Sequence, residues 1–230
     1  MKTLILFFLA CVLNFNSVAH AEDNITFIGN SLTRHLATPK IGWDGNWGMA
    51  ASAEEKDYVH QLVQQVNFSS GRNWNSTIIA ASSLEKNLFL NEKYLTELFK
   101  TINSDQKIII LQIGDNINYN GLDLVDFASK YGTLLSSIKP KLMPGGLLLC
   151  LGKWWKAPQV DVRIKAECEA AGGQYVDLLS ISSQAGAYAS TERSFSSPAV
   201  ARHPGDRAMS EIATHIYQAI LKHNPALVKN

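Results

Sequence analysis

The chain has 230 residues, of which 46% are hydrophobic and 18% are charged. This length favours one domain with a sizeable core, and no repeat, composition shift or Pro/Gly/Ser-rich linker marks a boundary. The 21 Lys and Arg nearly balance the 20 Asp and Glu, and no basic cluster occurs. This charge pattern argues against nucleic acid or an anionic membrane as the main partner.

The first 21 residues are predicted to be a cleaved signal peptide, which leaves residues 22–230 as a single domain. Lys2 supplies the positive start, and the apolar run Leu4–Leu13 is too short to span a bilayer. Ala19-His20-Ala21 has small residues at the two positions that a signal peptidase reads. Cys11 offers an alternative, because Leu9-Ala10-Cys11 resembles a lipobox. We expect cleavage after Ala21 and a secreted or periplasmic product without stable membrane insertion.

Two cysteines, Cys150 and Cys168, remain after cleavage. Export to an oxidising compartment permits a disulfide between them, since one ends an apolar strand and the other lies on the next predicted helix. The alternative is a pair of buried thiols that pack as small hydrophobic groups. Without nearby histidines they make a poor metal site, so neither a metal nor a cofactor is expected.

Five short apolar runs alternate with amphipathic stretches along the mature chain. Continuous apolar character without polar alternation is typical of strands that are buried on both faces of a parallel sheet. The predicted strands are Ile25–Ile28, Thr77–Ala81, Lys107–Ile113, Gly146–Leu151 and Gln174–Leu179. The order predicts an α/β fold, a three-layer sandwich with a five-stranded parallel sheet and helices on both faces.

The helices are indicated by apolar residues spaced three or four apart. Such stripes run from Tyr58 to Val66, from Phe127 to Ile138 and from Met209 to Ile220, and Leu84–Ile102 and Val160–Ala171 are further helix candidates. Ser52 and Glu55 have the spacing of a capping box for the first helix.

Ligands of open parallel sheets bind beyond the carboxyl ends of the strands, so the residues of a functional site are expected in the loops there. Ser31 follows the first strand, where its hydroxyl and its own N–H can face the same cleft. Asn116 follows the third strand in Gly114-Asp115-Asn116 and can aim an amide donor there. His203 precedes the last helix in a loop shaped by proline and glycine. Each motif alone is also ordinary turn chemistry.

Together the three blocks, "ITFIGNSLT", "ILQIGDN" and "ARHPGDRAMSEIA", resemble the SGNH hydrolase superfamily, also called GDSL-type esterases. The resemblance covers Ile25 to about Ile220 and implies a flavodoxin-like five-stranded fold. It further implies Ser31 as nucleophile, His203 as its base, and the Ser31 N–H and Asn116 side chain as oxyanion donors.

The chain departs from the family pattern at two places. Val200 stands where the family has an aspartate three residues before the histidine, so a backbone carbonyl near Val200 or a distant carboxylate must hold the imidazole. A Ser-His dyad is therefore predicted. Asp206 is expected to cap the final helix or brace the loop. The family's second block has a glycine donor after strand two, whereas this chain reads Ala80-Ala81-Ser82-Ser83, and that donor stays unassigned.

Tryptophans near these loops, Trp43, Trp47 and Trp154, are candidates for binding a sugar ring, although they could equally pack the loops. Trp155 follows Trp154 after the fourth strand, on the same predicted edge. The leading interpretation is an exported serine esterase acting on a small-molecule or carbohydrate ester, plausibly an O-acyl group on a carbohydrate or cell-envelope polymer. Two alternatives are an acyltransferase that uses the same pair with a sugar acceptor, and a non-catalytic carbohydrate-binding scaffold.

Overall fold

The structure, a computed structural model, describes residues 23–86, 92–117 and 123–229. The predicted signal peptide and Cys11 lie outside these residues. None of the helices in the described ranges is long and apolar enough to cross a membrane.

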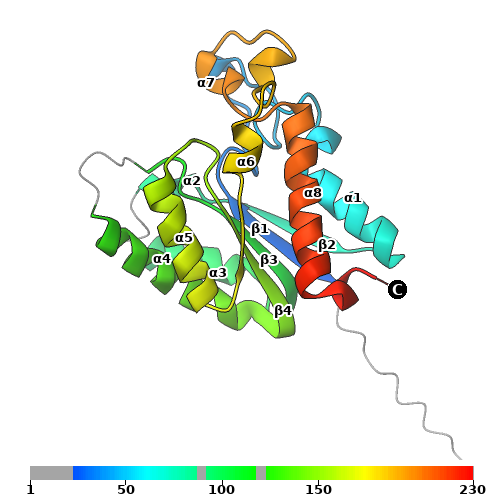
Figure 1. Ribbon diagram of the computed structural model, residues 1–230, viewed down its shortest axis with the longest axis vertical. Coiled ribbons are helices and arrows are strands. Elements are labelled where there is room, and N and C mark those ends of the chain that lie inside the picture. Colours follow the sequence, from blue (N-terminus) through cyan, green and yellow to red (C-terminus); the bar gives the residue numbers. More distant parts are fainter. Residues whose placement is uncertain (1–22, 87–91, 118–122, 230) are drawn as a thin grey trace, which may run out of the picture.

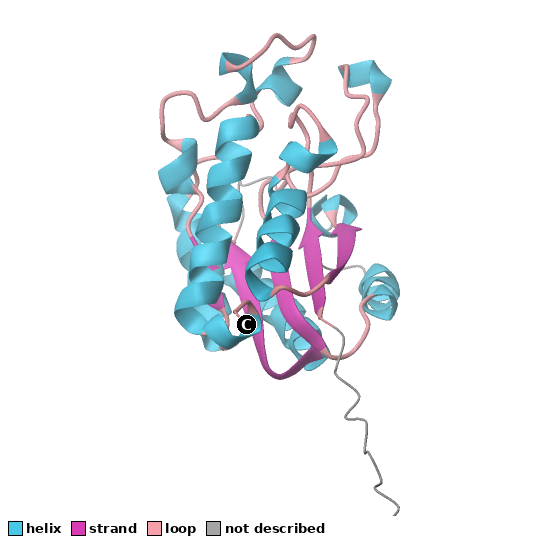
Figure 2. Ribbon diagram, turned by 90° about the vertical axis from the view of Figure 1, so that its right-hand side faces the viewer, coloured by secondary structure: helices cyan, strands magenta, loops and turns pink. Residues whose placement is uncertain are grey.

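A parallel sheet of five strands forms the centre of the molecule, as the sequence predicted (Figures 1 and 2). The spatial order is β2-β1-β3-β4-β5, so the chain starts in the middle of the sheet and winds outward in both directions. The strands are β1 (Asn24–Gly29), β2 (Asn75–Ala80), β3 (Gln106–Gln112), β4 (Leu142–Leu151) and β5 (Gln174–Val176). Since β1 and β3 are neighbours, the loops that follow them open at one edge of the sheet.

Helices cover both faces of the sheet, which completes the predicted three layers (Figure 1). One face carries α1 (Tyr58–Ser70) and α8 (Asp206–His223), and the other carries α3 (Glu92–Thr101), α4 (Leu124–Ile138) and α5 (Pro158–Ala170). Short helices complete the chain: α2 (Ser82–Lys86), α6 (Leu179–Ser182), α7 (Pro198–Ala201), and the 3-10 turns η1 (Pro39–Ile41), η2 (Glu54–Lys56), η3 (Lys139–Lys141), η4 (Ala189–Thr191) and η5 (Pro225–Leu227).

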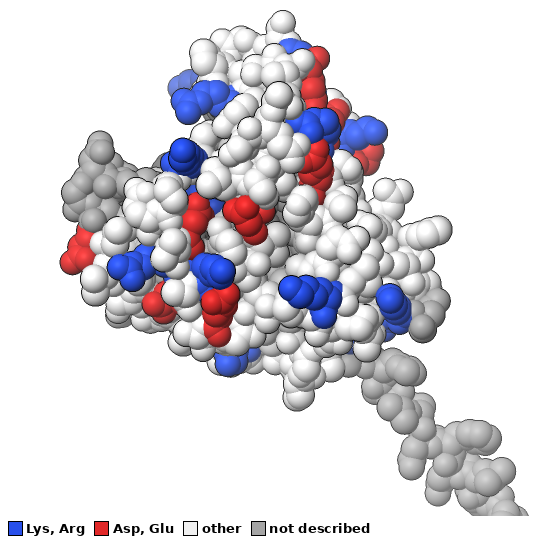
Figure 3. Space-filling model, in the orientation of Figure 1, with Lys and Arg blue, Asp and Glu red and all other residues white. Residues whose placement is uncertain are grey.

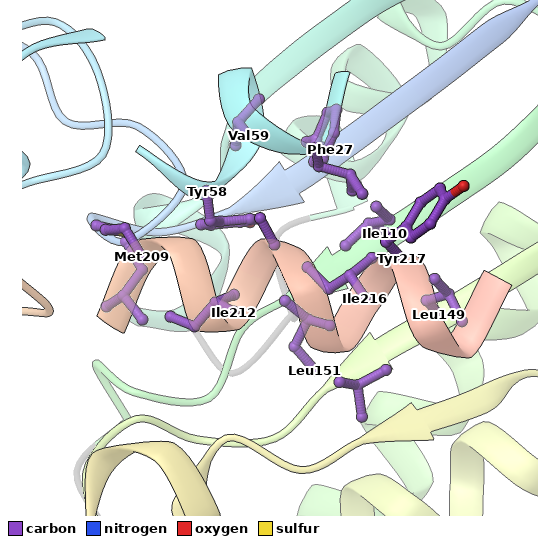
Figure 4. Packing of buried hydrophobic residues seen from close by; sticks show 14 of the residues in the cluster. Phe27, Tyr58, Val59, Ile110, Leu149, Leu151, Met209, Ile212, Ile216 and Tyr217 are labelled. Atoms are coloured by element: carbon purple, nitrogen blue, oxygen red, sulfur yellow. The ribbon is translucent and has the colours of Figure 1, made fainter. Parts of the chain in front are cut away.

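Alternate residues of the central strands feed two separate cores, one on each face of the sheet. Phe27 and Ile110 pack against α1 and α8, as Figure 4 shows, whereas Ile28 and Leu111 point to the opposite layer. All four side chains are fully buried. Burial on both faces explains why these strands read as unbroken apolar runs.

The two cysteines form a disulfide, which decides between the two alternatives. Cys150 at the end of β4 is joined to Cys168 of α5, with 6.2 Å between their Cα atoms. The bridge ties the sheet to the helix that covers it.

Two local predictions were wrong. The fifth strand ends at Val176, three residues early, because the Asp177 carboxylate accepts the N–H groups of Leu179 and Ser180, each at 3.0 Å, and starts α6. The helix expected after Ser52 begins at Tyr58, where Asp57 is the N-cap.

The supposed capping residue, Ser52, has a different role. Its N–H and hydroxyl both donate to the Asp206 carboxylate, at 2.7 and 2.5 Å. Asp206 lies in the first turn of α8, and its carboxylate braces the loop that precedes α1 instead of capping α8. Charged side chains on the face in Figure 3 are scattered and form no large patch of one sign.

Candidate active site

Ser31 lies in a tightly packed turn directly after β1. A Cβ on Gly29 would lie 1.9 Å from the Thr33 hydroxyl oxygen, so only glycine fits there. The Asn30 carbonyl accepts the N–H groups of Thr33 and Arg34, both at 2.9 Å, and the Ser31 carbonyl accepts the Met49 N–H at 2.7 Å. These bonds fix the backbone of the nucleophile candidate.

The structure brings Ser31 and His203 together across 172 residues of sequence. The Ser31 Oγ and His203 Nε2 atoms are 2.8 Å apart, and both side chains are nearly buried, at 7% and 6% exposure. A serine hydroxyl in hydrogen-bond contact with an imidazole nitrogen is the geometry that activates a serine nucleophile.

His203 is oriented by backbone carbonyls of α7. Its Nδ1 lies 2.9 Å from the Ala199 oxygen and 3.3 Å from the Val200 oxygen. Carbonyls only accept hydrogen bonds, so Nδ1 carries the proton and the Nε2 lone pair faces the Ser31 hydroxyl. The imidazole of His203 is therefore held by a backbone carbonyl, which is one of the two alternatives that the sequence left open.

Burial also makes His203 a weak base. Removal of the imidazole from water lowers its pKa to about 4, against smaller opposing effects of the hydrogen bonds to Ala199 and Val200. The neighbouring His35 and Arg202 act in the same direction as burial, more weakly than burial does. The imidazole is therefore neutral, and able to accept a proton, throughout the neutral pH range.

Asn116 is held by a buried carboxylate that sequence analysis overlooked. Its Nδ2 donates to Oε2 of Glu85 at 2.5 Å, while the other Glu85 oxygen accepts from Gly114 N and, at 3.2 Å, from Asn30 Nδ2. An amide nitrogen carries two hydrogens, so one of them is left for the cleft, which Asn116 lines. Glu85 thus links the loops after β1, β2 and β3.

The burial of Glu85 has an electrostatic cost. Its side chain is 1% exposed, and desolvation raises its pKa, opposed by the hydrogen bonds from Asn116, Gly114 and Asn30. The charged form of a buried carboxylate costs less free energy when several hydrogen-bond donors surround it, as they do for Glu85.

Ser82 lies in the stretch after β2 in which the sequence left the second backbone donor unassigned. It is the first residue of α2 and lines the same cleft as Ser31 and Asn116. In the described part of the chain, neither the Ser31 N–H nor the Ser82 N–H donates to a protein acceptor. Both N–H groups are therefore available as donors, and that of Ser82 is one of the first N–H groups of a helix, which generally lack a partner within the helix.

A second brace runs from the loop after β3 to His203. The buried Asp115 carboxylate accepts the Trp154 N–H at 3.1 Å, and the Trp154 indole N–H donates to the Arg202 carbonyl at 3.1 Å. Burial raises the Asp115 pKa to about 6, against the opposing charge of Lys153. The position of His203 therefore depends on Trp154, which is fully buried.

The cleft above the Ser31–His203 pair has a volume of about 410 Å³. Its lining consists of Ser31, His35, Ile41, Met49, Ser82, Asn116, Trp155, Ala199, Arg202 and His203. The Trp155 ring stands edge-on to the His203 ring, with centroids 5.1 Å apart. Within the described residues, no cluster of His, Cys, Asp and Glu could hold a metal ion.

The three tryptophans predicted to bind substrate do not line this cleft. Trp43 and Trp154 are buried, and Trp47 packs edge-on against Trp43 and donates to the Ala51 carbonyl. Trp43 and Trp154 pack the loops, because their side chains are covered by protein, whereas Trp47 is partly buried and packs against the core. Trp155, next to the predicted Trp154, is the tryptophan that reaches the cleft.

Glu85 and Ser82 were therefore given no role at the sequence level, whereas Trp155 was considered only as the neighbour of Trp154. Glu85 had one usable signal, an acidic residue beside apolar Leu84 just beyond a strand end. Ser82 stands two residues after the end of β2, just as Ser31 stands two residues after the end of β1. Trp154 and Trp155 differ in burial, but the sequence gives no sign of this difference because the two residues are identical and adjacent.

No protein-family model matches the chain, and no curated protein matches its sequence. Solved structures do match. A member of the lipolytic G-D-S-L family from Veillonella parvula is 13% identical, with 86% of this chain and 98% of that chain covered and a TM-score of 0.57. The psychrotrophic esterase EstA from Pseudoalteromonas, inhibited by monoethylphosphonate, is 12% identical, with coverages of 87% and 98% and a TM-score of 0.55.

A family two carbohydrate esterase from Clostridium thermocellum, in complex with cellohexaose, is 16% identical. The match covers 88% of this chain and 64% of that chain, with a TM-score of 0.57. At these identities the likeness is one of fold. The chain has the fold of the GDSL-type hydrolases, as its motifs predicted.

Proposed function

We propose that the protein is an exported serine esterase that hydrolyses O-acyl groups on a carbohydrate or cell-envelope polymer. The observation that carries the proposal is the 2.8 Å contact between Ser31 Oγ and His203 Nε2 at the floor of the cleft. The fold shared with esterases and lipases supports the same chemistry.

The reaction follows from the tautomer of His203. The Ser31 oxygen attacks the ester carbonyl carbon while its proton passes to Nε2, and the carbonyl oxygen becomes an oxyanion. When the tetrahedral intermediate collapses, Nε2 returns the proton to the departing alcohol and leaves an acyl group on Ser31. A water molecule, deprotonated by the same nitrogen, then releases the acid.

Three donors around Ser31 suit the oxyanion. They are the N–H groups of Ser31 and Ser82 and the free amide hydrogen of Asn116. All three residues line the cleft. Because Glu85 accepts from Asn116 on the side away from solvent, this amide is oriented before substrate binds.

The carbohydrate part of the proposal is supported by Trp155, whose partly exposed ring borders the cleft and can stack on a sugar. The structural likeness to a carbohydrate esterase points in the same direction. Export is supported by the apolar N-terminal segment and by the disulfide, a bond typical of oxidising compartments.

Labelling with a serine-reactive phosphonate tests the mechanism. We expect one adduct, on Ser31, that is absent in Ser31→Ala and strongly reduced in His203→Ala. His215→Ala is the matched control, since His215 is an exposed residue of α8 outside the cleft. Failure of the wild-type protein both to label and to hydrolyse acetyl esters would instead favour a non-catalytic scaffold.

A further inference from the structure

The described residues that line the cleft include a positive charge but no negative one. Of these described residues, only Arg202 carries a permanent charge. No Asp or Glu is among these lining residues. A bound ligand therefore meets one permanent positive charge, and no carboxylate on the cleft wall compensates it.

Arg202 differs from most other arginines of the molecule in having no partner. Arg72, Arg193 and Arg207 each form an ion pair, with Asp23, Asp206 and Glu211 respectively. The Arg202 guanidinium has no ion pair or hydrogen bond to any described residue, and its side chain is exposed. Its charge does not contribute to the fold through any such contact.

The backbone of Arg202 is nevertheless fixed. Its carbonyl accepts the Trp154 indole N–H at 3.1 Å, and the Trp154 side chain is fully buried. The guanidinium therefore extends from an immobile Cα at the rim of the cleft. An arginine held in this way presents a planar set of donors that matches a carboxylate or phosphate.

Arg202 also lies on a definite side of the reaction. It directly precedes His203, which in the proposed mechanism returns the proton to the departing alcohol. Both Arg202 and His203 line the cleft. Asn116 and Ser82, by contrast, are the groups proposed for the oxyanion. In the proposed mechanism the alcohol part of the ester leaves toward His203, so Arg202 is the charged lining residue next in sequence to the group that protonates it.

We propose that Arg202 is a specificity-determining residue that selects esters whose alcohol part carries a carboxylate or phosphate. A uronic acid or a sugar phosphate acylated on a neighbouring hydroxyl has this chemistry. The inference rests on the proposed esterase function. It narrows the substrate class from carbohydrate esters in general to anionic ones.

A matched pair of substrates tests the inference. Acetyl esters of methyl glucuronide and methyl glucoside differ only in the carboxylate, and an acetylated glucose phosphate tests whether phosphate can replace it. For the wild-type protein we expect kcat/KM about tenfold higher for the anionic esters, and a smaller ratio as salt is added. In Arg202→Gln the ratio should fall close to one.

Arg163→Gln is the control, because Arg163 is an exposed arginine of α5 outside the cleft, and its ratio should stay at the wild-type value. Each ratio is internal to one variant, so a partly inactive preparation does not distort it. A wild-type ratio near one, or a ratio that survives Arg202→Gln, would overturn the inference while leaving the esterase intact. A preference for charge only on the acyl side, tested with succinate and butyrate monoesters, would also overturn it. No turnover of any ester would refute the esterase proposal itself.

Discussion

Replacement of Glu85 by glutamine is the sharpest test of how the site is assembled. The substitution keeps the shape of the side chain and one oxygen, which can still accept from Gly114 N and Asn30 Nδ2. It places an NH2 group where the second oxygen accepts from Asn116 Nδ2 at 2.5 Å. Two donors then face each other, and the Asn116 amide must rotate away.

The expected loss is larger in turnover than in stability. An unsatisfied buried donor costs about 1–3 kcal/mol. Part of this cost is offset, because the substitution also removes a buried charge whose pKa is raised by desolvation. Nothing offsets the loss of the oxyanion donor, which typically reduces kcat by roughly 10²-fold. We therefore expect kcat to fall at least tenfold with KM nearly unchanged.

Steady-state kinetics on an acetyl ester, together with thermal unfolding, measures both effects. The double variant Glu85→Gln/Asn116→Asp serves as control, since an acid at 116 can accept from the new amide. It should recover stability but not turnover, because a carboxylate cannot donate to an oxyanion. Wild-type kcat in Glu85→Gln would refute this account of Asn116.

Three further outcomes follow from the contacts around His203 and the sheet. Burial lowers the pKa of His203 to about 4, and the neutral imidazole is the base. We therefore expect kcat/KM to stay high as the pH is lowered to about 5 and to fall only near pH 4. A fall of kcat/KM centred near pH 6.5, the ordinary pKa of histidine, would contradict this account of the burial of His203. Trp154→Phe removes the indole N–H that fixes the Arg202 carbonyl, so kcat should fall while the fold measured by circular dichroism persists. Trp74→Phe is the control, since it also removes the hydrogen bond of a buried indole, to Ser70, but Trp74 does not line the cleft. Reduction of Cys150–Cys168 should lower the unfolding free energy by about 3 kcal/mol, given the short loop that the bridge closes, and a Cys150→Ala/Cys168→Ala variant should no longer respond to reductant.

The sequence predicted the layers of the fold because strands buried on both faces have an unmistakable composition. Runs such as Lys107–Ile113 contain little but large apolar residues, and the structure places them in the centre of the sheet. The meeting of Ser31, Asn116 and His203 in one cleft followed from the rule that parallel strands carry their sites at the carboxyl edge.

The features that sequence reasoning missed depend on how deeply individual side chains are buried. Neighbouring residues can differ in burial although their sequence is alike. Trp154 is fully buried and Trp155 lines the cleft, although nothing in their sequence distinguishes them. Glu85 satisfies donors from loops 29 and 55 residues away, and such a network has no local pattern. Ser52 had the spacing of a cap, but Asp57 lay nearer to the helix start.

The carbonyl that holds His203 has a consequence for the alcohols that the proposed esterase can release. A carboxylate in that place would stabilise the imidazolium, whereas the Ala199 carbonyl offers only a dipole. The protonated ring is therefore a strong acid that gives up its proton readily. Such a group is poor at deprotonating serine but well suited to alkoxides of sugars, which leave only when protonated. Activated aryl esters, whose phenolates depart unaided, would gain nothing from this acidity.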